Sequence, residues 1–376
     1  MTNKKIMMLA TTDNMIWQFL LPHIKYLQDA GNMVECVCAK TGFWFDELQN
    51  KFGLKCHEIN FARSPLSFKN FKGYKALKKL QKQEKFDLIY CQQPVGGVMG
   101  RMIAKKFKLP CIYTAHGFHF FKGNSKIKNF IFKTIEKHYA KYTTALVTIN
   151  EEDYNAAKNW KAKHVYKING IGVDINKYKP DENLDRSEFR KSLGLSDRDF
   201  VVLSVGELNK NKNTFRLLEC IKEIGDERIK YVVCGQGPLK EDYEKFINEY
   251  NLQDRVKMLG FRKDVSNIYA ISDLYIMPSF REGLSKSMME AMSYGLPVVA
   301  SCIRGNVDLL GNSEGGVLCE PSSTEEFKNA IVKLFEDKQL REQFSNRNLQ
   351  FVKKFDLKVV IKQLEEIYEE CFNAGD

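Results

Sequence analysis

The sequence predicts an α/β protein with two doubly wound, Rossmann-like parallel-sheet domains that face each other across a cleft. Three observations predict this fold. Short apolar runs rich in β-branched and aromatic residues recur along the chain. Longer amphipathic or loop segments separate them, which is typical of a parallel sheet covered by helices. The chain has 376 residues, enough for two domains that each bury a core.

Each half of the chain has its own set of expected strands. Ligands of doubly wound sheets bind at the carboxyl ends of the strands, so the loops after these runs are where a site is expected. The expected strands are 6–9, 33–38, 87–91, 111–114 and 145–149 in the first half, and 200–205, 230–234, 256–259, 274–277 and 297–300 in the second.

Glycine and proline mark a boundary between the halves. Gly170, Gly172 and Pro180 interrupt the strand and helix pattern there. We expect a first domain over residues 1–172 and a second domain over residues 173–356. Apolar residues at helical spacing predict a last helix from Leu357 to Phe372, and the segment 357–376 is a candidate to pack back on the first domain.

Composition favours a cytoplasmic protein. No apolar run reaches the roughly 18 residues of a membrane-spanning helix. The run from Ile6 to Ala10 is short for an export signal, and we interpret it as a buried strand. The ten cysteines form no CxxC pair, which indicates reduced thiols. Residues 1–180 hold 30 Lys and Arg against 13 Asp and Glu, whereas residues 181–376 hold 28 against 34.

Two loops of the second half place glycines where a strand ends. Gly206 in SVGELNKNKN permits close approach of a ligand to the backbone, and Lys212 follows within reach of an anion. Gly235 and Gly237 in VCGQGPL follow the next strand. A GxG pattern alone fits an ordinary strand-to-helix turn as well as a phosphate loop.

The stretch PSFREGLSKSMMEAMSYGLPVV, residues 278–299, sets Glu282 before an expected helix and Glu290 within it. The N–H groups at the start of this helix suit a diphosphate, and a carboxylate beside it could accept hydrogen bonds from ribose hydroxyls. Glu290 lies off the apolar face, so we do not expect it in the core. Spacing alone also fits a helix-start charge at Glu282 and a solvated Glu290. The apolar face comprises Leu284, Met288, Ala291 and Met292.

Together these motifs resemble family 4 of the retaining glycosyltransferases. The stretch from residue 278 matches the family's E-x7-E signature, P-S-x-x-E-G-x-x-x-x-x-x-E-A-x-x-x-G-x-P-V-V. Three loop motifs match in the family's order: G-x-L-x-x-x-K from Gly206, G-x-G-P from Gly235 and V-x-x-L-G from Val256. The resemblance covers essentially the whole chain. It implies the GT-B fold, with a nucleotide-sugar donor held mainly by the second domain and an acceptor held by the first.

The resemblance also implies residue roles. Glu290 would bind the ribose, and Glu282 would hold the transferred sugar as a catalytic residue. The family usually has Arg after the first glycine, where this chain has Glu207, so Arg262 or Arg281 is a candidate to supply the missing phosphate ligand. The other implied donor-binding residues are Gly206, Lys212, Gly235 and Gly237, the base loop Leu259, Gly260, Phe261 and Arg262, and the turn Gly283, Leu284 and Ser285.

In the first half, YTAHGFHFFKG carries His116 after an expected strand. A histidine at a strand end is by default structural. The TxHGF pattern, however, resembles that of capsule and exopolysaccharide members of the family, where this histidine approaches the reacting carbon of the donor sugar. His116 is therefore the catalytic candidate in this half, and His119 is the second choice for the same role. On the acceptor side we expect Asp13, Asn14, Gln93, Gly96, Gly97 and His119, although the first loop lacks the Gly-Gly pair common in the family.

Basic charge concentrates in residues 51–141, with 20 Lys and Arg against four Asp and Glu. Aromatic residues and lysines alternate in residues 67–86 and 118–142. Such segments can lie on an anionic membrane, and they also fit ordinary amphipathic helices with a solvated lysine face. Nothing resembles a nucleic-acid recognition motif, so we expect no nucleic-acid partner. A lipid-linked acceptor would explain why the charge lies in the acceptor domain.

We expect no metal and no other cofactor. Asp197-Arg-Asp199 resembles a D-x-D metal motif but precedes its strand, and no cluster has metal-ligand spacing. The expected function is retaining transfer of a sugar from a nucleoside diphosphate, UDP by family precedent, to a hydroxyl of a lipid-linked saccharide in capsule or exopolysaccharide synthesis. The enzyme would be peripheral on the inner face of the cell membrane. A nucleotide-sugar 2-epimerase and a non-catalytic nucleotide-sugar-binding subunit are the alternatives.

Overall fold

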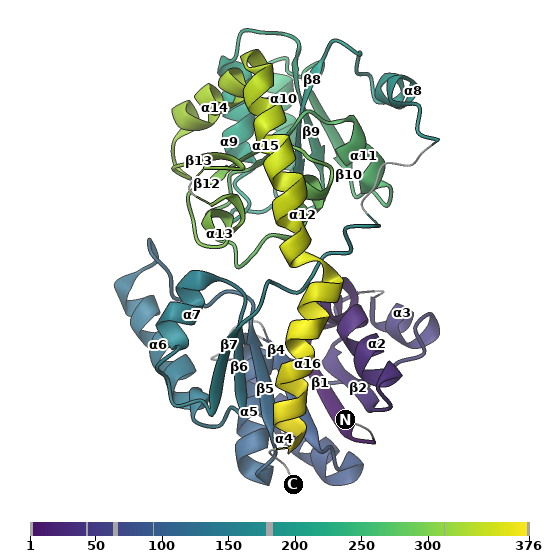
Figure 1. Ribbon diagram of the computed structural model, residues 1–376, viewed down its shortest axis with the longest axis vertical. Coiled ribbons are helices and arrows are strands. Elements are labelled where there is room, and N and C mark those ends of the chain that lie inside the picture. The colour runs from purple at the N-terminus through teal and green to yellow at the C-terminus, as the bar shows by residue number, and fades with distance from the viewer. Residues whose placement is uncertain are drawn as a thin grey trace. The chain divides into compact units, whose positions relative to one another are not determined.

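The computed structural model describes residues 3–42, 44–62, 67–92, 94–177, 183–311 and 313–373. These form two compact units, which are described separately (Figure 1). Unit 1 comprises Met1–Gly172 with Leu357–Asp376, and unit 2 comprises Val173–Asp356. Each unit is built on one all-parallel sheet, as expected from the sequence.

Unit 1 contains a seven-stranded sheet in the order β3-β2-β1-β4-β5-β6-β7. The first strand is buried along its centre, so the interpretation of Ile6 to Ala10 as a strand is confirmed. The sequence did not reveal β3 and β7, which lie at the sheet edges and carry polar residues such as His57 and His164. The strands are β1 (Lys5–Thr12), β2 (Met33–Ala39), β3 (Lys55–Glu58), β4 (Leu88–Gln92), β5 (Cys111–Ala115), β6 (Ala145–Thr148) and β7 (His164–Lys167).

Helices cover the sheet of unit 1. Helix α5 packs against both α4 and α6, and it contacts β1, β4 and β5. The last helix, α16, packs on α2, where Tyr368 stacks on Tyr26 and meets Tyr90 edge-on. The helices are α1 (Asp13–Met15), η1 (Ile16–Leu20), α2 (Leu21–Asp29), α3 (Trp44–Asn50), α4 (Phe68–Glu84), α5 (Val95–Phe107), α6 (Lys126–Ala140), α7 (Glu151–Ala157) and α16 (Leu357–Asn373).

Unit 2 contains a six-stranded sheet in the order β10-β9-β8-β11-β12-β13. The chain order reverses between β8 and β11, which is where a doubly wound sheet binds its ligand. The unpredicted strand β13 is short and begins at a glycine. The strands are β8 (Phe200–Val205), β9 (Ile229–Cys234), β10 (Val256–Gly260), β11 (Leu274–Met277), β12 (Val298–Ser301) and β13 (Gly316–Cys319).

Two hydrophobic clusters hold the helices of unit 2 on the two faces of its sheet. Among the helices that the structure describes, none is long and apolar enough to cross a membrane. The helices of unit 2 are α8 (Arg186–Ser192), α9 (Phe215–Glu223), α10 (Lys240–Glu249), α11 (Val265–Ile271), α12 (Lys286–Ser293), α13 (Asn306–Leu310), α14 (Thr324–Glu336), α15 (Lys338–Phe351) and η2 (Val352–Phe355).

Candidate active site

The loops after β8, β9 and β10 pack directly on one another at the carboxyl edge of the unit 2 sheet. The N–H of Gly206 donates to the Cys234 carbonyl at 2.9 Å, and the N–H of Gly235 donates to the Gly260 carbonyl at 2.8 Å. A Cβ on Gly235 would lie 1.8 Å from the Gly206 oxygen, and one on Gly237 would lie 2.4 Å from the Leu208 oxygen. Both glycines are therefore required by the contact between loops, and a phosphate-binding role for them stays a prediction.

Lys212, in the loop after β8, and Glu282, in the loop after β11, form an ion pair. The Nζ of Lys212 donates to Oε1 of Glu282 at 2.8 Å, and both side chains are largely buried. The loops that carry them are also joined, because the N–H of Phe280 donates to the Asn211 carbonyl and Nδ2 of Asn211 donates to the Arg281 carbonyl. Two residues separated by 70 positions are thus brought together, and their role in donor binding stays a prediction.

The helix after Glu282 is α12, which begins at Lys286. Ser285 is the N-cap of α12, and its hydroxyl accepts a hydrogen bond from the Met288 N–H. The turn from Glu282 to Leu284 therefore leads directly into the helix start. The positive end of the helix dipole and the amides of this turn favour an anion at this place.

Glu290 lies on α12 and is only 7% exposed. Its Oε2 accepts a hydrogen bond from the Tyr269 hydroxyl at 3.1 Å, and its Oε1 lies 4.0 Å from Nζ of Lys286. The expectation that Glu290 lies outside the core is wrong in this respect, because α11 covers the side of α12 that carries it. The pKa of the Lys286 amine is lowered, mainly by burial, while Glu290 acts in the opposite direction.

The loop expected to meet the base exposes an aromatic ring. Phe261 is 54% exposed, next to Gly260 with its φ of 65°. Arg262 donates two hydrogen bonds to the carboxylate of Asp264, at 2.8 and 2.6 Å. Arg262 is thus engaged by its own loop, which makes it less suitable as the missing phosphate ligand. Glu207 is exposed and accepts a hydrogen bond from Asn209.

Sequence reasoning missed Arg304, which lies on the loop between β12 and α13. Its side chain is 8% exposed, and its Nε lies 3.4 Å from the carbonyl oxygen of Glu282. The next residue, Gly305, has a φ of 77°, and a Cβ there would lie 2.1 Å from the Gly283 oxygen. The only sequence signal was its position shortly after the end of an expected strand.

In unit 1, His116 follows β5 and contacts the last residue of β4. Its Nε2 lies 2.8 Å from Oε1 of Gln92, whose side chain is fully buried. Burial, with the nearby His23 as the smaller cause, lowers the pKa of His116 to about 3. The ring is therefore neutral at physiological pH. With the proton on Nε2, the nitrogen left with a lone pair is Nδ1. Sequence reasoning chose the neighbouring Gln93, which lies outside the described residues.

The acceptor-side candidates of unit 1 have structural contacts. Asp13 is fully buried, and its carboxylate accepts hydrogen bonds from the N–H groups of Thr41 and Phe45. A Cβ on Gly96 would lie 3.1 Å from the Ala10 backbone, and one on Gly97 would lie 2.4 Å from the Tyr113 ring. Asn14 is half-buried beside Asp13, and His119 lies against Phe132, with ring centroids 5.4 Å apart. Contact of these residues with an acceptor stays a prediction.

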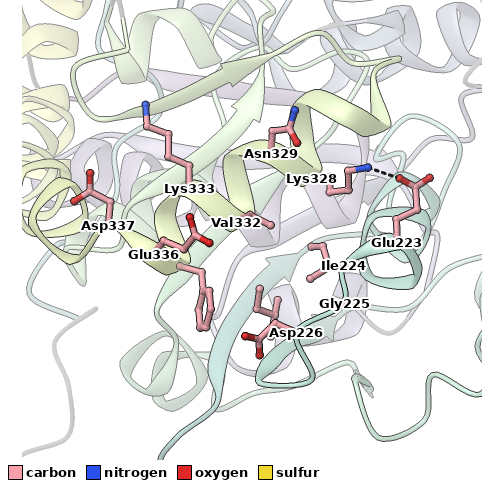
Figure 2. Close-up of a pocket in the computed structure, with 12 residues that line it drawn as sticks. Glu223, Ile224, Gly225, Asp226, Lys328, Asn329, Val332, Lys333, Glu336 and Asp337 are labelled. Carbon is pink, nitrogen blue, oxygen red and sulfur yellow. Dashed lines mark hydrogen bonds and ion pairs between the residues drawn. The ribbon is translucent and has the colours of Figure 1, made fainter.

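Two other features lie away from these strand ends. A hollow of about 630 Å³ lies at the amino-terminal edge of the unit 2 sheet, where Lys328 pairs with Glu223 (Figure 2). It is on the opposite edge from Lys212 and Glu282, and we assign it no part in the chemistry. In unit 1, Glu35, His57 and Glu84 could together hold a metal ion. Lys5 and Lys55 form ion pairs with both acids, however, so the negative charge is already balanced.

Comparison with known proteins identifies the family. Residues 5–150 match the family described as "Glycosyl transferase 4-like", and residues 185–351 match "Glycosyl transferases group 1". An Escherichia coli protein named UDP-Gal:alpha-D-GlcNAc-diphosphoundecaprenol alpha-1,3-galactosyltransferase is 33% identical over 299 residues, which cover 76% of each chain. The 376-residue chain therefore belongs to glycosyltransferase family 4. A Bacillus subtilis protein named "Putative glycosyltransferase EpsD" is 29% identical over 97% of this chain and 96% of its own.

Solved structures show the same fold. HepE of Anabaena, crystallised with UDP-glucose, superposes with a TM-score of 0.80 at 21% identity, over 98% of this glycosyltransferase and 100% of HepE. Sucrose-phosphate synthase of Thermosynechococcus elongatus gives a TM-score of 0.79 at 19% identity, over 99% and 100% of the two chains. The glycosyltransferase therefore has the GT-B fold, and the expectation of two Rossmann-like domains is confirmed.

The contact between His116 and Gln92 predicts a pH effect. Gln92→Glu places a carboxylate beside Nε2, which should raise the pKa of His116 by roughly 1 to 3 units from its value of about 3. NMR titration of the imidazole measures this shift. Because the pKa of His116 is lowered, the folded state binds a proton there less readily than the unfolded state does. The free energy of unfolding is therefore unaffected by this histidine above the ordinary histidine pKa, and it decreases as the pH falls from there toward about 3. The variant should lose less stability over that range.

Gln92→Ala is the control for this experiment. It removes the contact but not the burial or His23, so the pKa of His116 should stay well below its usual range. An unchanged titration in Gln92→Glu would show that Gln92 does not set the state of His116.

Proposed function

We propose that this glycosyltransferase transfers a sugar, with retention at the anomeric carbon, from a UDP-sugar to a hydroxyl of a lipid-linked saccharide in capsule or exopolysaccharide synthesis. The observation that carries the proposal is the Lys212–Glu282 pair at the start of α12, with Glu290 further along the same helix. The cation of Lys212 and the start of α12 suit a diphosphate. The carboxylates of Glu282 and Glu290 can accept hydrogen bonds from hydroxyl groups of a sugar and a ribose.

The chemistry needs one bond broken and one formed. The bond between the anomeric carbon and the diphosphate oxygen breaks through an oxocarbenium-like state, and the acceptor oxygen attacks the same face. The diphosphate, which gains negative charge, takes the acceptor's proton. Lys212 and the amides of residues 283–285 stabilise that charge. Because Glu282 is neutralised by Lys212, we assign it to holding the sugar and to balancing charge, and not to attack on the anomeric carbon.

Glu290 is assigned to the ribose. Its Oε2 already accepts one hydrogen bond from Tyr269, and a carboxylate can accept several. The exposed ring of Phe261 is assigned to stacking on the base. On the side of unit 1, His116 is assigned to the reacting carbon of the donor sugar, where a neutral Nδ1 can accept a hydrogen bond from a sugar hydroxyl.

The names of relatives support the substrate classes. The Escherichia coli relative is named for transfer from UDP-Gal to a diphosphoundecaprenol-linked sugar. A Campylobacter jejuni relative, 23% identical over 94% of this chain, is named for transfer to a diphospho-undecaprenol-linked acceptor. CapM of Staphylococcus aureus, 24% identical over 98% of this chain, is named for capsular polysaccharide biosynthesis. HepE was crystallised with UDP.

Exposed apolar side chains on α4 and α6 support a peripheral membrane position. Phe68 is 92% exposed and Phe71 60%, both on the first turn of α4. On α6, Ile127 and Phe130 are each 73% exposed, and Ile131 is 48% exposed. All three lie opposite the buried face of α6, which carries Glu136 and Ala140. Lysines surround them on both helices, which suits a bilayer with anionic headgroups.

Membrane binding can be measured by sedimentation with vesicles of mixed anionic and neutral phospholipids. Binding should weaken as salt is added. Lys78, Lys79 and Lys82 changed together to Glu should weaken it by roughly a hundredfold or more, because each basic residue contributes about 1 kcal/mol. Ile127→Ser with Phe130→Ser should weaken it without loss of thermal stability, since both side chains are exposed.

The control is Tyr250→Ser, which removes an aromatic side chain of 37% exposure from unit 2. This variant should bind the vesicles as the wild type does. Absence of binding by the wild type at low salt would reject the membrane position but not the transferase activity.

The donor can be identified by incubating the protein with a panel of nucleotide sugars and a membrane lipid extract. Release of free nucleoside diphosphate together with a labelled lipid supports transfer. Absence of turnover with every donor, in the presence of the extract, would reject the proposal.

A further inference from the structure

Two arginines flank the turn that carries Glu282. Arg281 precedes it in the chain, and Arg304 comes from the loop after β12, with its Nε 3.4 Å from the Glu282 carbonyl. Arg304 is 8% exposed. The contact between Gly305 and the Gly283 carbonyl is too close for any side chain at position 305, so the loop holds Arg304 against the turn.

Lys212, in the loop after β8, contacts the same turn. Its Nζ binds the Glu282 carboxylate, and the Asn211 side chain next to it binds the Arg281 carbonyl. Further hydrogen bonds restrain the Arg304 loop, because Nδ2 of the buried Asn306 donates to the Ser301 carbonyl at 3.0 Å. Cationic side chains from the ends of β8, β11 and β12 therefore meet at one restrained turn.

This arrangement has an electrostatic cost. The pKa of the Arg281 guanidinium is lowered by burial first and by Arg304 second, and Glu282 opposes this effect without cancelling it. The charge of Arg304 thus acts on the partly buried Arg281, and such an accumulation of positive charge favours a bound anion. The other residues near this turn are less suitable for binding an anion. Arg262 forms an ion pair with Asp264, and the loop after β8 carries the acidic residue Glu207.

We infer that Arg304, together with Arg281, binds the diphosphate of the nucleotide sugar opposite Lys212. This inference rests on the proposed nucleotide-sugar donor and adds a residue that no sequence motif indicated. A guanidinium can donate two parallel hydrogen bonds to a phosphate, whereas Lys212 supplies a point charge. Negative charge on the diphosphate grows as the glycosidic bond breaks, so the arginines should lower the barrier as well as the dissociation constant.

The test compares binding of UDP, GDP and the corresponding nucleosides by calorimetry. Arg304→Gln should weaken binding of the preferred nucleoside diphosphate by roughly tenfold or more, because it removes a charge-assisted contact. It should leave nucleoside binding unchanged. The affinity of Arg304→Lys for the nucleoside diphosphate should lie between those of the wild type and Arg304→Gln. Lysine keeps the positive charge but cannot donate two parallel hydrogen bonds.

Arg228→Gln is the matched control. Arg228 is paired with Asp226 on an exposed turn before β9, and its loss should change no affinity. Melting temperatures establish that each variant is folded, and Arg281→Gln gives an independent measure of the same subsite. Unchanged diphosphate affinity in both Arg304→Gln and Arg281→Gln, or equal losses for nucleoside and diphosphate, would overturn the inference and leave the proposed function intact. If the wild type binds no nucleoside diphosphate, the proposed donor itself is wrong.

Discussion

Glu282→Gln should lower the turnover number by roughly 10² to 10³, the range found when a preorganised electrostatic contact to a transition state is removed. The side chain keeps its size, so the change tests charge and not packing. Without the carboxylate, Lys212 loses its partner at 2.8 Å and the transferred sugar loses an acceptor for its hydroxyl hydrogen bonds. Steady-state kinetics with the identified donor give the turnover number and KM separately.

The donor dissociation constant should change much less than turnover in Glu282→Gln, because the freed Lys212 can still bind the diphosphate. Glu325→Gln is the control, since Glu325 is an exposed acid in the first turn of another unit 2 helix, α14. It should transfer at the wild-type rate. Wild-type turnover in Glu282→Gln would mean that Glu282 is not a catalytic residue.

Glu290→Ala should mainly weaken donor binding, by roughly tenfold to a hundredfold, because hydrogen bonds from the ribose to a charged group are lost. It should also lower the free energy of unfolding by about 1 to 3 kcal/mol, since the Tyr269 hydroxyl loses a buried acceptor and the Lys286 amine loses its ion-pair partner. Calorimetric titration with the nucleoside diphosphate and chemical denaturation measure the two effects.

Tyr269→Phe separates these two effects. It removes the hydroxyl that binds Glu290 but keeps the carboxylate and the ring, so stability should fall while donor affinity changes little. If Glu290→Ala and Tyr269→Phe weaken donor binding equally, Glu290 supports the structure of α12 and does not contact the ribose.

Most strands and the helix that carries Glu290 could be predicted because their signals are local. Buried strands such as β8 read as continuous apolar runs, and the apolar spacing from residue 284 to residue 292 reads as a helix. Edge strands such as β3 and β7 have no apolar run, because only part of their surface is buried. Nothing in their own residues distinguished them from loops.

The parts of the site that escaped prediction depend on contacts distant in sequence. Glu290 is buried because Tyr269 of α11 covers it, which spacing along α12 cannot reveal. Gln92 at the end of β4 contacts His116 after β5, and nothing in the local sequence indicates a contact between neighbouring strands. Gly96 and Gly97 follow the pattern of a ligand loop, yet their missing side chains make room for Ala10 and Tyr113.

The central claim is that unit 2 holds a nucleotide sugar for transfer and not for rearrangement. The most direct test incubates the protein with the identified nucleotide sugar, with and without lipid-linked acceptor, and determines the anomeric configuration of the product by NMR. The account predicts that nucleoside diphosphate is released only with acceptor, in equal amount to a glycolipid whose new linkage keeps the donor's configuration. Conversion of the nucleotide sugar without acceptor, as an epimerase would produce, or a product of inverted configuration would contradict it.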